Sequence, residues 1–329
     1  MDNLLVSVLM PVLNEERFVA QALDSILAQN YPNLEILVID GGSKDRTCEI
    51  VRSYQQDDSR IRLIHNPGKW QVRALNIGLN EARGHIIMRV DGHAILEEGY
   101  IEHAVRHLML ENGVDNVGGV HQAVGLTPMG KAIAVAHGSP FAVPSLYRTS
   151  SRDTYVDSLF MGAWRRDLFE RIGGWNEKFT VTEDYEHNYR IRQKGGKILL
   201  TTDMRSVYYC RNTLPQVWQQ YSRYARGRVM MLRHYPKSLR IRQVVAPAFV
   251  AALLCGVVLS VFIEWVRYLW GSMVGLYLIA ALVEALRLSR GDWGLLWRLP
   301  LVFATLHISW GVGFWRAVGE SLLGEKNFS

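Results

Sequence analysis

The feature that most constrains the fold is a run of twenty residues, 244–263, that contains no charged side chain. An apolar helix of about 20 residues is long enough to cross the hydrocarbon core of a bilayer. Two further apolar runs follow at residues 268–283 and 299–315, and His307 is the one titratable residue of the last run. A helical hairpin buried in a soluble domain is the alternative, but the first run is too long and too uniform for it. We therefore expect two to three transmembrane helices within residues 244–329.

The basic residues around these runs predict their orientation. Three precede the first run and three follow the second: Lys237, Arg240, Arg242, Arg287, Arg290 and Arg298. By the positive-inside rule, residues 1–243 and the 287–298 loop then lie in the cytoplasm. A full crossing by the third run, which we favour, leaves the short tail outside, whereas a re-entrant or interfacial third segment keeps it inside. The expected location is the inner (cytoplasmic) membrane, with several spans and residues 1–243 facing the cytoplasm.

Upstream of these runs, short apolar segments alternate with amphipathic ones. We expect strands at residues 5–10, 34–39, 61–65, 86–90 and 117–124, and helices at residues 16–29, 45–54, 72–81, 100–110 and 183–193. Strands that alternate with helices predict an α/β fold with a mostly parallel sheet covered on both faces. Residues 126–156 are rich in Gly, Pro, Ser and Thr, which is typical of a long loop or lid.

Residues 214–235 have the pattern of a basic amphipathic helix. Such a helix can lie on an anionic leaflet or act as a lid over a bound ligand, and the two roles are compatible. The expected organisation is a catalytic domain over residues 1–212, an interfacial segment over 213–243 and a membrane region over 244–329.

Charge, cysteine spacing and motifs together limit the functional classes. The net charge of +6 is compatible with binding to nucleic acid, an anionic membrane surface or a phosphorylated ligand. Three cysteines lie far apart without a CxxC pair, which argues against a disulfide scaffold and against structural zinc. The chain has no G-x-G-x-x-G after its first strand, no P-loop and no recognisable nucleic-acid module, so we expect no nucleic-acid partner. Its first residues lack the features of a signal peptide.

Polar residues follow three of the expected strands. The three stretches are MPVLNEE at residues 10–16, VIDGGSKDRT at 38–47 and GHIIMRVDGHAIL at 84–96. Open α/β sheets bind ligands at the carboxyl ends of their strands. Asp40 can accept hydrogen bonds from a base or a ribose, or form only a turn, and Ser43 and Asp45 are expected to cap the following helix. The Asp-Gly-His sequence from Asp91 to His93 is either a metal site with an altered ligand or a polar turn.

Several ordered motifs carry a family resemblance. The stretch SVLMPVLNEERFVAQALDSILAQNYPNLEILVIDGGSKDRT resembles the opening of the inverting family-two glycosyltransferases of GT-A fold. The resemblance continues through NPGKWQVRALNIGLNEARGHIIMRVDGHA, FMGAWRRDLFERIGGWNEKF and TEDYEHNYRIRQKGG, and covers most of residues 5–230. The DGH variant and the short membrane tail look most like the ExoA-type bacterial enzymes of exopolysaccharide (succinoglycan) assembly. The resemblance implies a Rossmann-like GT-A domain followed by C-terminal transmembrane helices.

The resemblance also implies roles for individual residues. Asp184, in TEDYE, matches the catalytic base, and Glu183 beside it matches a residue that shapes the acceptor site. Asp91 matches the first acid of a motif that holds Mn²⁺ or Mg²⁺, and His93 is a metal ligand, a diphosphate contact or a residue packed beside the site. The residues implied in donor binding are Pro11, Asn14, Glu15, Asp40, Lys69, Arg73, Gln220, Arg223 and Tyr224. The last three resemble a QxxRW motif with Tyr in place of Trp.

The chemistry of inverting sugar transfer fits these assignments. A single displacement at the anomeric carbon needs a base for the acceptor hydroxyl and positive charge on the departing nucleoside diphosphate. Asp184 lies in the first turn of an expected helix, where the helix dipole favours an ionised carboxylate.

The expected function is that of a membrane-anchored hexosyltransferase of exopolysaccharide biosynthesis. By resemblance, it moves glucose from UDP-glucose to a polyprenyl-diphosphate-linked oligosaccharide. One alternative is an enzyme that charges polyprenyl phosphate with a single sugar. Another is a non-catalytic membrane scaffold that only binds a nucleotide sugar.

Overall fold

The computed structural model describes residues 4–142 and 145–323. The chain divides into two compact units, the first formed by Met1–Gln122 with Leu146–Tyr208 and the second by Ala123–Ser145 with Tyr209–Ser329. The second unit therefore also contains residues 123–145, which lie within the expected catalytic domain of residues 1–212. The tail that would follow a third crossing, beyond residue 323, lies outside the described residues.

The first unit is built on a mixed sheet with the strand order β3-β2-β1-β4-β8-β6-β9-β5, and β7 pairs with β9. The strands are β1 Val6–Val12, β2 Leu34–Asp40, β3 Ile61–His65, β4 Ile86–Arg89, β5 Ala94–Leu96, β6 Val114–Val124, β7 Thr154–Tyr155, β8 Ala163–Arg165 and β9 Lys197–Tyr209. The run from β3 to β4 is parallel, whereas β8 pairs antiparallel with both β4 and β6. The four parallel strands have long connections that leave their carboxyl ends at one edge.

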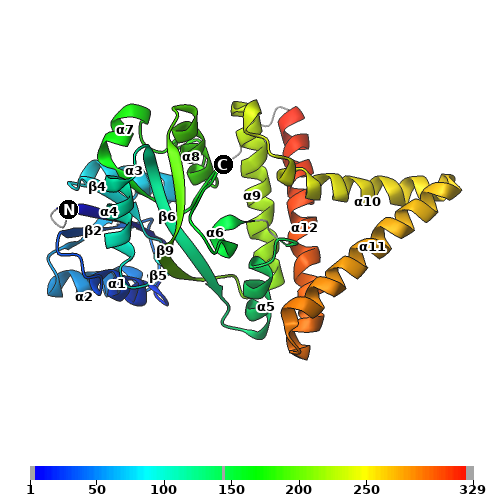
Figure 1. The fold of residues 1–329 in the computed structure, drawn as a ribbon, viewed down its shortest axis with the longest axis horizontal. Coiled ribbons are helices and arrows are strands. Elements are labelled where there is room, and N and C mark those ends of the chain that lie inside the picture. Colours follow the sequence, from blue (N-terminus) through cyan, green and yellow to red (C-terminus); the bar gives the residue numbers. More distant parts are fainter. Residues whose placement is uncertain (1–3, 143–144, 324–329) are drawn as a thin grey trace. The chain divides into compact units, whose positions relative to one another are not determined.

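Helices cover both faces of this sheet (Figure 1). They are α1 Val19–Leu27, α2 Thr47–Asp57, α3 Gln71–Glu81, α4 Tyr100–Leu110, α6 Leu146–Thr149, α7 Arg166–Ile172 and α8 Glu183–Gln193. Successive side chains of a strand point to opposite faces, so Val8 and Val38 pack with α1, α2 and α4, while Leu9 and Leu37 pack with α3, α7 and α8. The expected α/β class is therefore confirmed, with burial on both faces explaining the continuous apolar runs of the parallel strands.

The prediction of a long loop over residues 126–156 was wrong. This stretch contains α5 Pro128–His137 as well as α6 and β7. Thr127 caps α5, because its hydroxyl accepts a hydrogen bond from the Gly130 N–H at 2.9 Å, and Pro128 occupies the start of the helix. A threonine cap followed by proline is a helix-start signal that the overall composition of the stretch concealed.

The second unit is helical. It contains α5, α9 Leu214–His234, α10 Val245–Phe262, α11 Glu264–Ser289 and α12 Trp293–Leu322. The last three are long and apolar enough to cross a membrane by length and composition. Figure 1 shows α9 beside α12, and α10 and α11 leaving α12 to meet at their far ends. Ala225 and Val229 of α9 pack with Phe314 and Ala317 of α12, so much of the apolar side of α9 is covered by protein.

Candidate active site

The carboxyl ends of β1 and β2 place two loops side by side. In the β1–β2 register, Val12 pairs with Asp40 at the last position of each strand. Beyond it, the Asn14 N–H donates to the Ser43 hydroxyl at 2.8 Å, and the Lys44 N–H donates to the Asn14 side-chain oxygen at 2.8 Å. Asn14 is held in the left-handed region, with φ 56°. The two loops that carry the LNEE and DGGS motifs are therefore fastened to each other.

Ser43 and Asp45 were both expected to cap α2, and only Asp45 does so. Asp45 accepts a hydrogen bond from the Thr47 N–H at 3.0 Å, at the start of α2, as expected. The Ser43 hydroxyl instead accepts a hydrogen bond from the Asn14 N–H of the neighbouring loop. The prediction that Ser43 caps α2 was therefore wrong. The loop–loop contact needs a partner 29 residues away, and local sequence gives no signal for it.

Asp40 forms a tight turn at the end of β2. Its carboxylate accepts hydrogen bonds from the Gly42 N–H at 2.9 Å and from the Ser43 N–H at 3.1 Å. Burial alone would raise the pKa of Asp40, but the hydrogen bonds from Ser43 and Gly42 outweigh it and lower the pKa below its ordinary value. A cavity of about 480 Å³ opens beside Asp40 between α2 and β3, with Arg52 and His65 in its lining. An ionised acceptor thus borders a cavity of ligand size.

Lys69 and Arg73 lie on the next connection, after β3. Lys69 adopts a left-handed conformation with φ 60°, and its carbonyl oxygen would lie 3.0 Å from a Cβ added at Gly41. Gly41 therefore allows the turn after β3 to approach the turn after β2. Arg73 is an exposed residue of α3 whose side chain passes over Gly68. Pro11 is buried within β1, so it shapes the strand end from inside the sheet.

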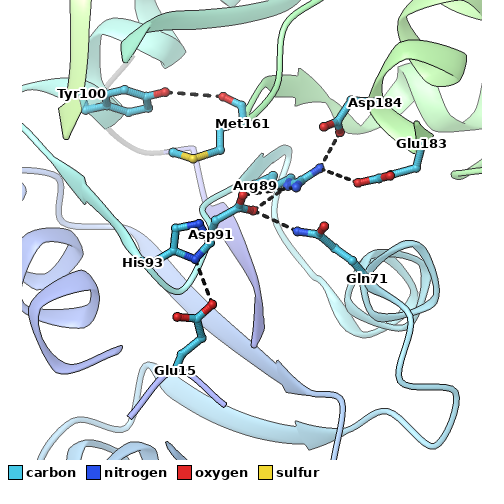
Figure 2. A network of polar contacts seen from close by, with 9 residues as sticks. All are labelled: Glu15, Gln71, Arg89, Asp91, His93, Tyr100, Met161, Glu183 and Asp184. Atoms are coloured by element: carbon cyan, nitrogen blue, oxygen red, sulfur yellow. Dashed lines mark hydrogen bonds and ion pairs between the residues drawn. The ribbon is translucent and has the colours of Figure 1, made fainter. Parts of the chain in front are cut away.

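The centre of the site is a cluster of one buried arginine and three acidic side chains (Figure 2). Arg89 is only 3% exposed and lies at the end of β4. Its Nε donates to Asp91 Oδ1 at 2.7 Å, and its terminal nitrogen Nη1 contacts Asp184 Oδ1 at 2.5 Å and Glu183 Oε1 at 3.2 Å. The structure therefore brings together Asp91, Glu183 and Asp184, which the sequence singled out, around a cation that it did not.

The two neighbouring acids of α8, Glu183 and Asp184, differ in their protonation. Burial, reinforced by the Asp184 charge, raises the pKa of Glu183 to about 8, despite Arg89. Burial also raises the pKa of Asp184, and Arg89 opposes that increase. The Asp184 side chain is more exposed, 19% against 5% for Glu183, and makes the shorter contact with Arg89. We therefore place the proton on Glu183 and the negative charge on Asp184 near neutral pH.

Asp91 and His93 have separate partners. Burial tends to raise the pKa of Asp91, but Arg89 outweighs it and the pKa is lowered, and the Gln71 amide donates to Asp91 Oδ1 at 3.2 Å. His93 Nδ1 contacts Glu15 Oε1 at 2.9 Å. Among the described residues, no group of three His, Cys, Asp or Glu side chains could hold a metal ion. A carboxylate and an imidazole still suit Mn²⁺ as donors, provided that a bound ligand such as a diphosphate supplies further oxygens.

Gln220, Arg223 and Tyr224 belong to the second unit, on α9. The Gln220 amide donates to the Tyr224 hydroxyl at 3.0 Å, one helical turn away. Arg223 and Tyr224 are exposed, whereas Gln220 is buried. The motif thus presents its cation and its aromatic ring on the surface of α9.

Arg89 and Gln71 were not predicted as site residues from the sequence. The signal for Arg89 was present, because a charged residue inside the apolar stretch IIMRV must be paired if the strand is buried. Gln71 had no such signal, since a polar residue at the start of a helix is ordinary.

Comparison with known proteins identifies the family and the fold. The Glycosyl transferase family 2 profile matches residues 7–173. Succinoglycan biosynthesis protein ExoA of Rhizobium meliloti (strain 1021) is 29% identical over 94% of this chain and 93% of its own length. A dolichyl N-acetyl-alpha-D-glucosaminyl phosphate 3-beta-D-2,3-diacetamido-2,3-dideoxy-beta-D-glucuronosyltransferase of Methanococcus voltae is 22% identical over 95% of this chain and 97% of its own.

Two solved structures share the fold. A mannosyltransferase of Pyrobaculum calidifontis in complex with GDP-Man and Mn²⁺ has a TM-score of 0.62 at 18% identity, covering 98% of this chain and 88% of that one. GalNAc-T7 with UDP, GalNAc and Mn²⁺ has a TM-score of 0.52 at 16% identity, covering 69% and 51%. The likeness supports the GT-A fold. Because the family profile covers about half of the sequence and the motifs follow in order, this chain belongs to glycosyl transferase family 2.

Proposed function

We propose that this protein is a membrane-anchored inverting glycosyltransferase that extends a lipid-linked glycan. The donor is a nucleotide sugar, with UDP-glucose as first choice, and the acceptor is a polyprenyl-diphosphate-linked oligosaccharide of exopolysaccharide synthesis. The observation that carries the proposal is the contact of Arg89 with Asp91 and Asp184. The relatives add support, since one is named for succinoglycan biosynthesis and the other for transfer to a dolichyl-phosphate-linked sugar.

In this proposal the two acids of α8 have different roles. Asp184, held ionised by Arg89, takes the proton from the acceptor hydroxyl as that oxygen attacks the anomeric carbon. Glu183, neutral near pH 7, shapes the acceptor side without adding a second negative charge. The proton therefore passes from the acceptor to Asp184, while the carbon–oxygen bond to the nucleoside diphosphate breaks.

The donor is held by residues of the parallel half of the sheet. We assign the base and ribose to Asn14, Glu15 and Asp40, with Pro11 shaping the strand end, and the diphosphate to Lys69 and Arg73. Gln220, Arg223 and Tyr224 of α9 are assigned to the diphosphate and acceptor. A divalent metal, Mn²⁺ or Mg²⁺, would be held by Asp91 and His93 and would supply positive charge to the departing diphosphate.

A second candidate reaction is the charging of polyprenyl phosphate with one sugar. It uses the same donor site and the same base, and the product separates the two reactions. A lipid-monophosphate sugar indicates charging, whereas a lengthened glycan on the lipid indicates extension.

The test is a donor and acceptor screen with the purified full-length protein. UDP-glucose and GDP-mannose are supplied with bacterial lipid extract, and release of nucleoside diphosphate is measured together with the lipid product. Asp184→Asn should lower turnover by about 10²–10⁴-fold, the usual contribution of a general base, with UDP affinity nearly unchanged. The matched control is Asp58→Asn, which breaks a partly exposed pair with Arg60 at 2.7 Å and should keep full turnover.

Two outcomes would contradict the proposal. Near-normal turnover in Asp184→Asn removes that residue from the base role. Binding of a nucleotide sugar without any diphosphate release, across all donors and lipids, favours the scaffold instead.

A further inference from the structure

Helices α10 and α11 are apolar on all sides. Only 11% of the most apolar window of each helix is buried within the structure. Large exposed side chains surround them, among them Leu254, Val258, Phe262, Trp265, Leu276 and Val283. A helix that is apolar all round and not covered by protein needs lipid around it. The 18 residues of α10 extend about 27 Å at 1.5 Å per residue, close to the thickness of a bilayer core.

The turn between the two helices is charged. Glu264 starts α11 directly after Ile263, and the Arg267 guanidinium donates to the Ser260 carbonyl oxygen at 3.3 Å. These charges lie at the far ends of α10 and α11, where the helices meet (Figure 1). A hairpin of this length places its charged tip at the opposite membrane surface.

Helix α12 differs from these two helices in having two distinct faces. A third of its most apolar window is buried, three times the fraction in α10 or α11. Buried Val302, Leu306 and Ser309 repeat at helical spacing, while Leu301 and Val312 are exposed. The exposed apolar face that carries Leu301 and Val312, with protein covering the opposite face, suits a helix that lies in the membrane–water interface.

Helix α9 flanks the C-terminal half of α12. The Ser222 hydroxyl donates to the Ser309 carbonyl oxygen at 3.2 Å, and Arg226 pairs with Glu320 at 2.8 Å. Between these contacts, a Cβ added at Gly313 would lie 2.7 Å from the Ser222 Cα. Residues 309–320 of α12 are therefore in close contact with α9.

The segment after α5 flanks the preceding part of α12. His307 Nε2 donates to the Phe141 carbonyl oxygen at 2.9 Å, and the Phe141 and Phe303 rings meet edge to face at 5.2 Å. The Ser139 hydroxyl also donates to Glu284 of α11 at 2.5 Å. Residues 303–320 of α12, about 27 Å of helix, thus lie against either α9 or the segment that follows α5.

The charges on α9 decide between the two orientations of α12. This helix carries Arg223, Arg226, Arg228 and Arg233. If α12 crossed the bilayer, α9 would enter the hydrocarbon beside it, where each arginine is strongly unfavourable. We propose that α9 and α12 lie together at the cytoplasmic membrane surface, and that the α10–α11 hairpin is the one part that crosses. The end of α12 is then on the same side as α9, contrary to the third crossing that the sequence favoured.

The inference rests on the membrane anchoring in the proposed function, not on sugar transfer, so it can fail while the transferase activity stands. The test labels single cysteines in the full-length protein after Cys48, Cys210 and Cys255 are replaced by serine. Ser321→Cys reports the end of α12 and Glu264→Cys reports the hairpin tip. Ser59→Cys, on an exposed turn of the first unit, is the matched cytoplasmic control.

A membrane-impermeant maleimide is added to spheroplasts and to inverted membrane vesicles. We expect Ser321→Cys and Ser59→Cys to react in the inverted vesicles and to lose labelling in spheroplasts, and Glu264→Cys to show the reverse. Labelling of Ser321→Cys from outside overturns the proposal.

A depth measurement covers the case in which the end of α12 is shielded from the reagent. Spin labels at Leu301 and Val312 of α12 are compared with labels at Leu254 and Phe262 of α10, using oxygen and a water-soluble nickel complex as relaxants. We expect shallow, equal depths for the two α12 sites and a greater depth for Leu254. Depths at Leu301 and Val312 that match Leu254 overturn the proposal.

Discussion

Replacing Arg89 by glutamine removes the buried guanidinium that contacts three carboxyl groups, at 2.7 Å from Asp91, 2.5 Å from Asp184 and 3.2 Å from Glu183. Removing one partner of a buried ion pair costs about 3–5 kcal/mol, because an uncompensated charge remains. For a domain of 150–250 residues, 1 kcal/mol corresponds to about 2–4 °C in Tm. We therefore expect Arg89→Gln to lower the Tm by about 6–20 °C.

The loss of stability caused by Arg89→Gln should depend on pH. Without Arg89, the pKa values of Glu183 and Asp184 in the folded state rise further above their ordinary values, and Asp91 loses the interaction that lowers its pKa. Stability contributed by such groups is present at low pH and is lost as pH rises through the folded pKa. The Tm difference between wild type and Arg89→Gln should therefore be smaller at pH 5 than at pH 8.

The assay is thermal unfolding in detergent, followed by tryptophan fluorescence between pH 5 and pH 8. Arg62→Gln is the matched control, because Arg62 pairs with Glu81 at 2.6 Å with both side chains at least a third exposed. Pairs of that kind contribute about 0–1 kcal/mol. An Arg89→Gln shift no larger than that of Arg62→Gln, or one equal at all pH values, would refute the reasoning.

Three further predictions use the same kinds of measurement. The pKa of Glu183 is raised to about 8 from an ordinary 4.5. The protonated Glu183 side chain therefore contributes its full stabilisation below pH 4.5, and this stabilisation declines as the pH rises toward 8. The wild-type Tm should fall more steeply over this interval than that of Glu183→Gln, and equal slopes would contradict the shift. Gly119→Ala places a Cβ 1.9 Å from the Met204 carbonyl oxygen and should cost about 1–3 kcal/mol, whereas Gly138→Ala, with 3.4 Å to its nearest atom, should leave the Tm unchanged. His93→Asp should move the metal preference of the transferase from Mn²⁺ toward Mg²⁺, and an unchanged metal profile would leave His93 as a turn residue.

The sequence predicted the local elements well where periodicity alone determines them. The expected bounds agree with Ile61–His65, Tyr100–Leu110 and Glu183–Gln193. Tyr100–Leu110 has a clear apolar period, and the glycine pair at residues 195 and 196 marks the end of Glu183–Gln193. The helix Pro128–His137 was missed since its start depends on one cap, not on composition.

The candidate site was predicted in part for a related reason. Asp91 and Asp184 were both expected in the site, because each matches a motif of the family that the sequence resembles. Their connection through Arg89 was not foreseen, since it joins residues 94 and 95 positions apart. Whether a charge in a strand is buried or exposed depends on such distant partners.

The contact between Ser222 and Gly313 has a consequence for how the protein responds to its lipid. A Cβ at Gly313 would lie 2.7 Å from the Ser222 backbone, so the two helices cannot slide past each other without losing this fit. Ser222 lies between Gln220 and Arg223, and α12 in turn contacts both arms of the α10–α11 hairpin through Trp315 and His307. A bilayer that is too thin or too thick tilts such a hairpin. If the hairpin crosses the bilayer as proposed, a change in bilayer thickness should be transmitted to α9, the helix that carries Gln220 and Arg223. Turnover should then vary with acyl-chain length even when every substrate is saturating.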